Sequence, residues 1–163
     1  MNDKPGQQLL LNFPSHPEYN FSNFVVSEGS RIAFETAKEF CSENPAPYQA
    51  LYLFGQKNLG KTHLLLSIGN RAAEKGLRAI CIQGHDFVDK LGGDPSPETQ
   101  QTLEQLLDVD FFLMDNIESL SQSPKAQEKL YHIYNEMMEK GGKLAFTAGL
   151  PPDRNSAMES YLT

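Results

Sequence analysis

Residues 55–62 constrain the fold of this chain more than any other feature of the sequence. They read Gly-Gln-Lys-Asn-Leu-Gly-Lys-Thr and fit the pattern G-x-x-x-x-G-K-[ST] of phosphate-binding P-loops. A short apolar run at residues 50–54 precedes the motif, and a helical pattern follows it at residues 62–75. A chance match is expected in on the order of 1% of chains with ordinary glycine content. The sequence therefore predicts a strand, a phosphate-binding loop and a helix in that order.

Each fixed position of the motif has a chemical reason. Gly55 and Gly60 allow a turn tight enough for successive backbone N–H groups to face a phosphate. The positive end of the following helix points at the same anion. Lys61 is predicted to reach the β- and γ-phosphates, and the Thr62 hydroxyl is predicted to bind Mg²⁺.

A second apolar run supplies the acid that such a site needs. Residues 111–114 are Phe-Phe-Leu-Met, and Asp115 follows them, so Asp115 is predicted to hold Mg²⁺ through water as the Walker B acid. The next residue, Asn116, can orient an attacking water but cannot accept its proton. Glu118 is the less favoured alternative acid. The pattern predicts slow hydrolysis or retention of the nucleotide.

Thr147 is the third candidate catalytic residue, with Asp115 and Asn116. It ends a predicted strand at residues 143–147, and we expect this strand to lie beside the P-loop strand. A polar side chain at its tip would then face the γ-phosphate and sense it. The alternative is a β-branched residue chosen only for packing in a strand.

The remaining pattern alternates strands with helices. Strands are predicted at residues 50–54, 78–83, 109–114 and 143–147. Helices are predicted at residues 27–42, with Ser27 as N-cap, and at 62–75, 85–91, 98–107 and 123–140. Such alternation favours an α/β fold of three αβα layers with a mostly parallel sheet. Residues 1–20 differ in composition and are predicted to be an extended tail before a nucleotide-binding domain at residues 21–163.

Composition restricts the partners and the location of the chain. The 14 Lys and Arg residues are scattered and are outnumbered by 21 acids, so the net charge is −7. Direct binding to DNA is therefore not expected. No apolar run approaches the ~20 residues of a membrane span, and no signal peptide is recognisable. Cys41 and Cys81 show no ligand spacing, which favours buried thiols in the cytoplasm.

Several segments together resemble a known family. Residues 52–55 (Tyr-Leu-Phe-Gly) and 58–65 (Asn-Leu-Gly-Lys-Thr-His-Leu-Leu) resemble the AAA+ core of the bacterial replication initiator DnaA. Residues 19–26 look like the segment that precedes this core. Residues 114–118 and 150–152 look more like Hda, the DnaA-related regulator that inactivates the initiator. The resemblance spans about residues 8–163 and implies a P-loop NTPase of the AAA+ (ASCE) type that binds ATP or ADP with Mg²⁺.

The resemblance enlarges the candidate site. It implies that Asn58, Leu59 and His63 border the nucleotide beside the P-loop. It also implies that Phe24 and Val25 help to hold the adenine. From its position alone, His63 is expected to pack or cap the helix rather than to take part in catalysis.

The chain also departs from the family pattern. Ser27 and Ser30 stand where the family usually has Gly and Asn. The family continues beyond Thr163 with an arginine finger, a fifth strand and a helical lid, so the lid is expected to be absent here. Without the fifth strand, residues 50–54 are expected to form an exposed edge that self-associates or is covered by residues 9–13.

The tail carries a possible docking peptide. Gln8, Leu9, Leu11 and Phe13 are similar to the short motif with which Hda docks on the sliding clamp of DNA polymerase. In such a motif the Gln makes hydrogen bonds while the apolar side chains fill a pocket. The other interpretation is that these side chains cover the domain's own surface.

Three functions follow from these patterns. The first is a DnaA/Hda-related nucleotide switch in the regulation of replication initiation, with DnaA and the clamp as partners. The second is a noncatalytic interaction module that keeps the P-loop fold and docks on the clamp. The third is a helicase-loader-type ATPase, which would bind single-stranded DNA. Turnover separates the first from the second, and salt-dependent DNA binding would favour the third.

Overall fold

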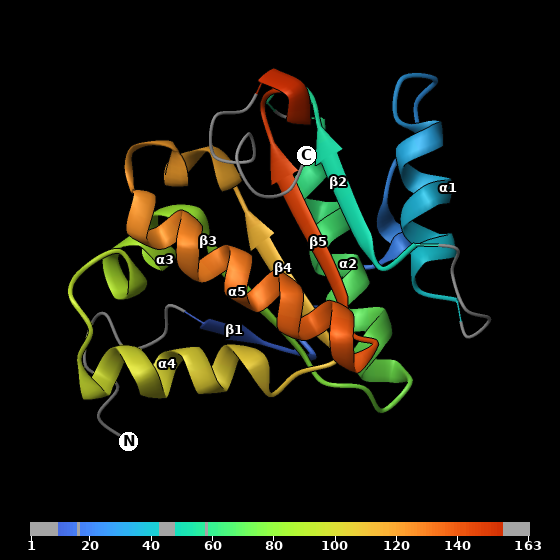
Figure 1. The fold of residues 1–163 in the computed structure, drawn as a ribbon. Helices are drawn as coiled ribbons and strands as arrows, with labels where there is room; N and C mark the ends of the chain where they lie inside the picture. The colour runs from blue at the N-terminus through green and yellow to red at the C-terminus, as the bar shows by residue number, and fades with distance from the viewer. Residues whose placement is uncertain (1–9, 16, 43–47, 58, 155–163) are drawn as a thin grey trace.

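The computed structural model describes residues 10–15, 17–42, 48–57 and 59–154, and they form a sheet with helices on both faces (Figure 1). The strands are β1 Leu10–Asn12, β2 Ala50–Phe54, β3 Ala79–Gln83, β4 Phe111–Asp115 and β5 Lys143–Ala148. They are arranged in the order β1-β3-β4-β5-β2. The β3–β4, β4–β5 and β5–β2 pairs are parallel, and β1 pairs antiparallel with β3. The predicted three-layer α/β fold with a mostly parallel sheet is confirmed.

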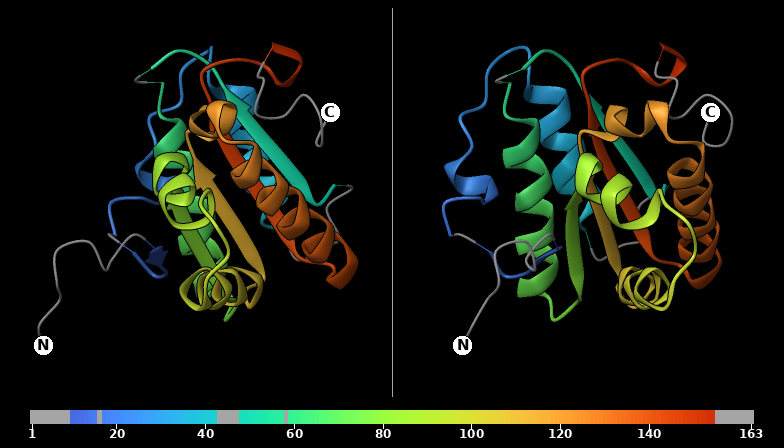
Figure 2. Two further views of the ribbon diagram at one scale, coloured as in Figure 1. Left: turned by 60° about the vertical axis from the view of Figure 1, so that its left-hand side comes forward. Right: turned by 90° about the vertical axis from the view of Figure 1, so that its left-hand side faces the viewer.

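The helices divide between the two faces of the sheet, as the turned views of Figure 2 show. One face carries α1 Arg31–Phe40 and α2 Lys61–Glu74. The other carries α3 Gly84–Leu91, α4 Pro97–Leu107 and α5 Pro124–Lys140. Short 3₁₀ helices lie at Phe21–Asn23, Ile117–Gln122 and Pro152–Arg154. None of the helices within the described residues has the length and apolar character to cross a bilayer.

Strand β4 shows how the sequence divides the core in two. Its side chains alternate between the faces, as the two-residue period of a strand requires. Phe111 and Leu113 pack with α1 and α2, whereas Phe112 and Met114 pack with α3, α4 and α5. All five residues of β4 are buried. A continuous apolar run is therefore the signature of a central parallel strand covered on both faces.

The ends of the helices follow local hydrogen bonding. Ser96 and Ser123 cap α4 and α5, and their side chains accept hydrogen bonds from the backbone N–H groups of Thr99 and Ala126. Ser27 was predicted to cap the first helix, and this prediction is wrong. The Ser27 backbone N–H donates to Ser30 Oγ at 2.9 Å and the two residues form a turn, so that α1 begins only at Arg31.

The N-terminal segment lies at a different edge from the one predicted. The edge of β2 was expected either to self-associate or to be covered by residues 9–13. The second alternative is wrong, because Leu10–Asn12 form β1 on β3, at the opposite side of the sheet. Phe13 packs on α2, where its ring lies against Gly69, and a Cβ at Gly69 would come within 2.3 Å of that ring. The missing side chain therefore makes room for the ring. In the described part of the chain, β2 forms the other edge of the sheet, as expected.

Truncation of a central core side chain should be far more costly than truncation of an exposed one. We expect Phe112→Ala to lower the free energy of unfolding by about 3–5 kcal/mol, because the ring is fully buried. Ile32→Ala is the control, since Ile32 is 82% exposed, and its effect should stay within about 0.5 kcal/mol. Urea unfolding followed by circular dichroism measures both. Similar losses for the two variants would contradict the described core.

Candidate phosphate-binding site

The predicted site residues meet at the carboxyl ends of three neighbouring parallel strands. The P-loop follows β2, Asp115 ends β4, and Thr147 lies one residue before the end of β5. The Gly55 backbone N–H donates to the Ala148 carbonyl at 3.2 Å and so ties the P-loop to β5. The predicted pairing of the P-loop strand with the strand of Thr147 is confirmed.

The backbone of the P-loop depends on its glycines. Gly55 has a φ of 151° and Gly60 a φ of 84°, both in a region that residues with a side chain rarely adopt. Gly60 is the N-cap of α2 and brings no side chain to its first turn. The N–H groups of that turn therefore stay available to an anion, which the helix dipole also attracts. Asn58 lies outside the described residues.

Lys61 folds over the loop. Its Nζ donates to the carbonyl of Gly55 and, at 2.8 Å, to the carbonyl of Gln56. The ammonium group is thus held beside the loop backbone. A cleft of about 400 Å³ lies here, lined by Lys57, Gly60, Lys61, Thr62 and Asn116.

The Asp115 carboxylate is the centre of a buried polar network. It is 4% exposed and accepts hydrogen bonds from Thr62 Oγ1 at 2.9 Å, from Gln83 Nε2 at 3.1 Å and from Thr147 Oγ1. Three donors compensate the cost of burying the charge. Burial and, secondarily, the Asp115 charge raise the pKa of the Cys81 thiol above its ordinary value, so that the nearby thiol stays neutral.

Thr147 and Asn116 complete this network. The Thr147 hydroxyl donates to Asp115 and accepts from the Asn116 backbone N–H at 2.9 Å, and the Thr147 side chain is fully buried. Asn116 has a left-handed backbone, with φ 60° and ψ 62°, which Asn tolerates better than most residues. Its side chain donates to Gln83 Oε1 at 3.3 Å.

Sequence reasoning missed Gln83. The residue ends β3 and stands opposite Asp115 in the strand register, so it bridges Asp115 and Asn116. The available signal was a polar residue at the carboxyl end of a predicted strand. Glu118 lies further along, in the 3₁₀ helix, near Gly149 after β5. Among the described residues, its buried Oε2 has no hydrogen-bond partner.

Apolar and aromatic side chains border the opposite side of the loop. Phe24 packs directly on the P-loop, because a Cβ at Gly60 would come within 2.5 Å of its ring. The Phe24 ring lies edge-on to His63, with the ring centroids 5.3 Å apart. His63 Nε2 donates to the Asn20 carbonyl at 3.0 Å, so His63 packs against this segment. Val25, which follows Phe24 in the chain, and Leu59 of the P-loop are 88% and 56% exposed.

The fit of Mg²⁺ to these residues follows from their donor atoms. Thr62 and Asp115 offer hydroxyl and carboxylate oxygens, which are the hard ligands that Mg²⁺ prefers. The 2.9 Å bond between Thr62 Oγ1 and Asp115 Oδ2 places both within reach of one ion or its water shell. In the parts of the chain that the structure describes, no group of three or more His, Cys, Asp or Glu side chains could hold a metal ion.

Loss of the Thr147 hydroxyl should destabilise the chain even without a ligand. Thr147→Val keeps the shape but leaves the Asn116 N–H unpaired and removes one donor from Asp115. We expect the free energy of unfolding to fall by about 1–3 kcal/mol. Thr102→Val, at a half-buried position on α4, is the matched control. Urea unfolding in nucleotide-free buffer measures both, and equal effects would count against the network.

Comparison with known proteins finds consistent matches over most of this chain. Residues 15–163 match the family model described as the bacterial DnaA ATPase domain. The chromosomal replication initiator protein DnaA of Campylobacter fetus subsp. fetus is 33% identical over 158 residues, which is 96% of this chain and 35% of that protein. The chain thus spans about a third of the length of the curated relatives it matches.

Solved structures agree with this match. AMPPCP-bound DnaA from Aquifex aeolicus superposes with a TM-score of 0.80 at 27% identity, over 90% of this chain and 47% of that chain. A replication initiator DnaA bound to AMPPCP and single-stranded DNA superposes with the same TM-score and identity, over 90% of this chain and 46% of that chain. The DnaC helicase loader, at 20% identity and a TM-score of 0.65 over 86% of this chain and 84% of that chain, shares the fold alone.

Proposed function

This chain belongs to the bacterial DnaA ATPase-domain family, and we propose that it binds ATP or ADP with Mg²⁺ at the carboxyl edge of its sheet. The observation that carries the proposal is the 2.9 Å hydrogen bond between Thr62 and Asp115 directly beside the P-loop. The AMPPCP bound to the related Aquifex aeolicus protein supports it.

The residues around the P-loop would divide the work of binding. The backbone N–H groups between Gly55 and Thr62 and the first turn of α2 would hold the phosphates. Lys61 would leave the Gly55 and Gln56 carbonyls for a phosphate oxygen. Thr62 and Asp115 would hold Mg²⁺, which neutralises phosphate charge when bound.

The base would lie on the aromatic and apolar side of the loop. Phe24 and His63 would form its inner wall, and the exposed side chains of Val25 and Leu59 would add apolar surface. An unpaired apolar surface next to a phosphate site suits the planar faces of a purine. The preference for adenine follows from the family.

Slow hydrolysis is part of the proposal. Asn116 lines the phosphate cleft, and its amide can orient a water but cannot take a proton from it. Thr147 would act through its bonds to Asp115 and Asn116, so that it links the strand ends to the phosphate. We propose that the nucleotide serves chiefly as a switch.

In the cell, the switch would act in the regulation of replication initiation through contacts with DnaA, as an Hda-like protein would. The net charge of −7 favours protein contacts over DNA, although a related DnaA is bound to single-stranded DNA. The exposed edge of β2 is a further surface for self-association. A noncatalytic module is the alternative, whereas a helicase loader has only the shared fold in its favour.

Docking on the sliding clamp would carry a structural cost. Leu11 and Phe13 of the proposed peptide pack against the core on the α2 side, while Gln8 and Leu9 lie outside the described residues. A clamp could bind all four side chains only after β1 leaves β3. This packing favours the interpretation that residues 10–13 cover the domain's own surface.

Removal of the P-loop lysine should strongly weaken nucleotide binding. We expect the wild-type chain to bind ADP and ATP saturably in the presence of Mg²⁺, and Lys61→Ala to weaken both by at least about tenfold, since a charge-assisted hydrogen bond contributes about 1.5–3 kcal/mol. Lys129→Ala, on α5 across the sheet, is the charge-matched control. Isothermal titration calorimetry measures the affinities. Equal affinities of the two variants would place the nucleotide elsewhere.

A carboxylate at position 116 should accelerate hydrolysis. We expect the wild-type chain to turn over ATP more slowly than about 1 s⁻¹, and Asn116→Asp to raise the rate about 10²-fold, because an Asp can accept the proton of the attacking water. Asn135→Asp on α5 is the control. Release of phosphate under saturating ATP gives the rates. An unchanged rate in Asn116→Asp, with a loss of turnover in Glu118→Gln, would assign the role to Glu118 instead.

A further inference from the structure

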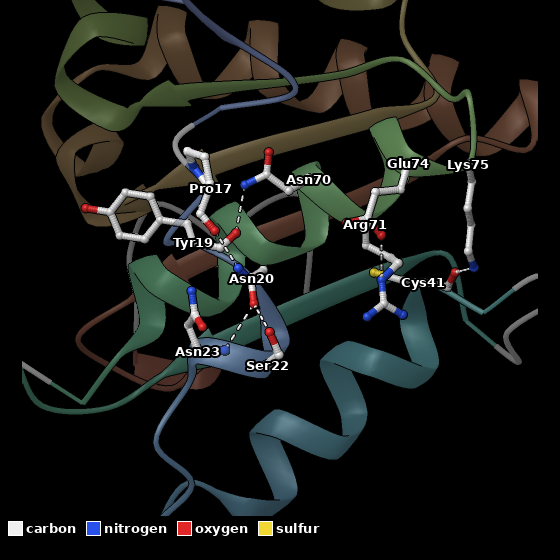
Figure 3. Close-up of polar contacts among 10 residues, drawn as sticks. All are labelled: Pro17, Tyr19, Asn20, Ser22, Asn23, Cys41, Asn70, Arg71, Glu74 and Lys75. Carbon is white, nitrogen blue, oxygen red and sulfur yellow. Dashed lines mark hydrogen bonds and ion pairs between the residues drawn. The ribbon is translucent and has the colours of Figure 1, made fainter.

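The segment between β1 and the P-loop side of the molecule runs along α2 as a strap. We define the strap as residues 13–15 and 17–24, and Figure 3 shows the polar contacts of its middle part. It meets α2 first near Gly69 and last near Gly60, so it runs opposite to the helix. The strap also packs on α1, where Phe34 lies against the rings of Phe21 and Phe24. The three anchors described next are on α2 or at its start, and α2 is the helix that begins at the P-loop.

The first anchor is the packing of Phe13 on Gly69. The ring fills the space where a Cβ of Gly69 would stand, at 2.3 Å from that position. Phe13 directly follows β1, whose Leu11 faces the same core cluster. The pairing of β1 with β3 and the contact of the strap with α2 therefore form one continuous attachment.

The second anchor is Asn70, a buried amide whose two ends are both used. Its Oδ1 accepts from the Ser15 backbone N–H at 2.7 Å, and its Nδ2 donates to the Tyr19 carbonyl at 2.7 Å and to Ser15 Oγ at 3.3 Å (Figure 3 shows the Tyr19 bond). Asn70 is 7% exposed, so losing these partners would leave buried polar groups unpaired. The Asn70 side chain thus binds the strap at two points, Ser15 and Tyr19.

The third anchor reaches the candidate site. His63 donates to the Asn20 carbonyl at 3.0 Å and lies edge-on to the Tyr19 ring, with centroids 5.5 Å apart. Phe24 ends the strap against Gly60 of the P-loop. Between these points, the Asn20 side chain accepts from the Asn23 backbone N–H at 3.0 Å and holds the turn, as Figure 3 shows.

We propose that the strap couples the docking of β1 to nucleotide binding, with Asn70 as the positioning residue between them. The inference rests on the proposed function. A docked strap holds His63 and Phe24 where they form the wall of the site, and a bound nucleotide holds the P-loop where Phe24 packs. Each event therefore stabilises the other by the same factor. A partner that detaches β1 from β3 would loosen the nucleotide, and loss of nucleotide would make β1 easier to detach.

Hydrogen exchange of the full chain tests the coupling in one direction. ADP with Mg²⁺ should slow backbone exchange in peptides covering residues 10–15 about fivefold or more, although they lie at the far end of the strap from the P-loop. Exchange in α5, on the other face of the sheet, should change much less. Unchanged exchange at residues 10–15 under saturating ADP would overturn the proposal.

Variants of the strap test the other direction. Gly69→Ala places a methyl group where the Phe13 ring lies, so the ring must move away, and circular dichroism checks that the variant still folds. Asn70→Ala removes the hydrogen bonds of Asn70 to Ser15 and Tyr19. Gly69→Ala and Asn70→Ala should each weaken ADP binding about fivefold or more. Asn135→Ala, the same change at an exposed position of α5, should leave the affinity for ADP unchanged. Wild-type affinity for ADP in Gly69→Ala and Asn70→Ala would overturn the coupling.

Failure of the proposed function would be recognised separately. If the wild-type chain binds no ADP, that function fails, and the strap is then tested in the nucleotide-free chain. Gly69→Ala should still raise exchange at residues 20–26, because the strap moves as one unit between its anchors. Unchanged exchange there, with faster exchange only at residues 10–15, would overturn the strap as a coupling element.

Discussion

The hydrogen bond between Thr62 and Asp115 is the interaction on which the rest of the site depends. It joins the first turn of the P-loop helix to the end of β4, a strand that is not adjacent to β2. The bond is possible because β5 lies between β2 and β4 and all three strands are parallel, so their carboxyl ends meet at one edge. The topology of the sheet therefore assembles a phosphate loop and a carboxylate from residues more than fifty positions apart.

The same edge is costly to build, because it buries the charge of Asp115. A buried carboxylate needs donors, and Thr62, Gln83 and Thr147 supply them. Thr147 in turn accepts from the Asn116 backbone N–H. This network fixes the positions of Thr62, Gln83 and Thr147 relative to Asp115. The strap is held in a similar way by hydrogen bonds. Asn70 and His63, both on α2, donate to the backbone carbonyls of Tyr19 and Asn20.

The sequence predicts the parts of this arrangement that arise from local pattern. The P-loop motif, the apolar run before Asp115 and the alternation of strands and helices each depend on a few adjacent residues, and the structure has all three. Gln83 was not predicted because its role comes from the pairing of β3 with β4, which no local pattern encodes. The predicted covering of the β2 edge by residues 9–13 was wrong for a similar reason. The observed position of β1 depends on the packing of the Phe13 ring against Gly69, more than fifty residues away in the chain. The start of α1 was missed because Ser30 Oγ accepts from the Ser27 backbone N–H and bonds to the Ser27 hydroxyl, so that these residues form a turn before the helix.

The central claim is that a nucleoside phosphate occupies the edge formed by the P-loop, Asp115 and Thr147. Titration of isotopically labelled chain with ADP and Mg²⁺, followed by backbone amide NMR, tests it most directly. The account predicts that the largest shifts fall on the amides of residues 55–62, where N–H groups meet phosphate, with smaller shifts at Asp115 and Asn116. Shifts confined to the other face of the sheet, or none at saturating ADP, would contradict it.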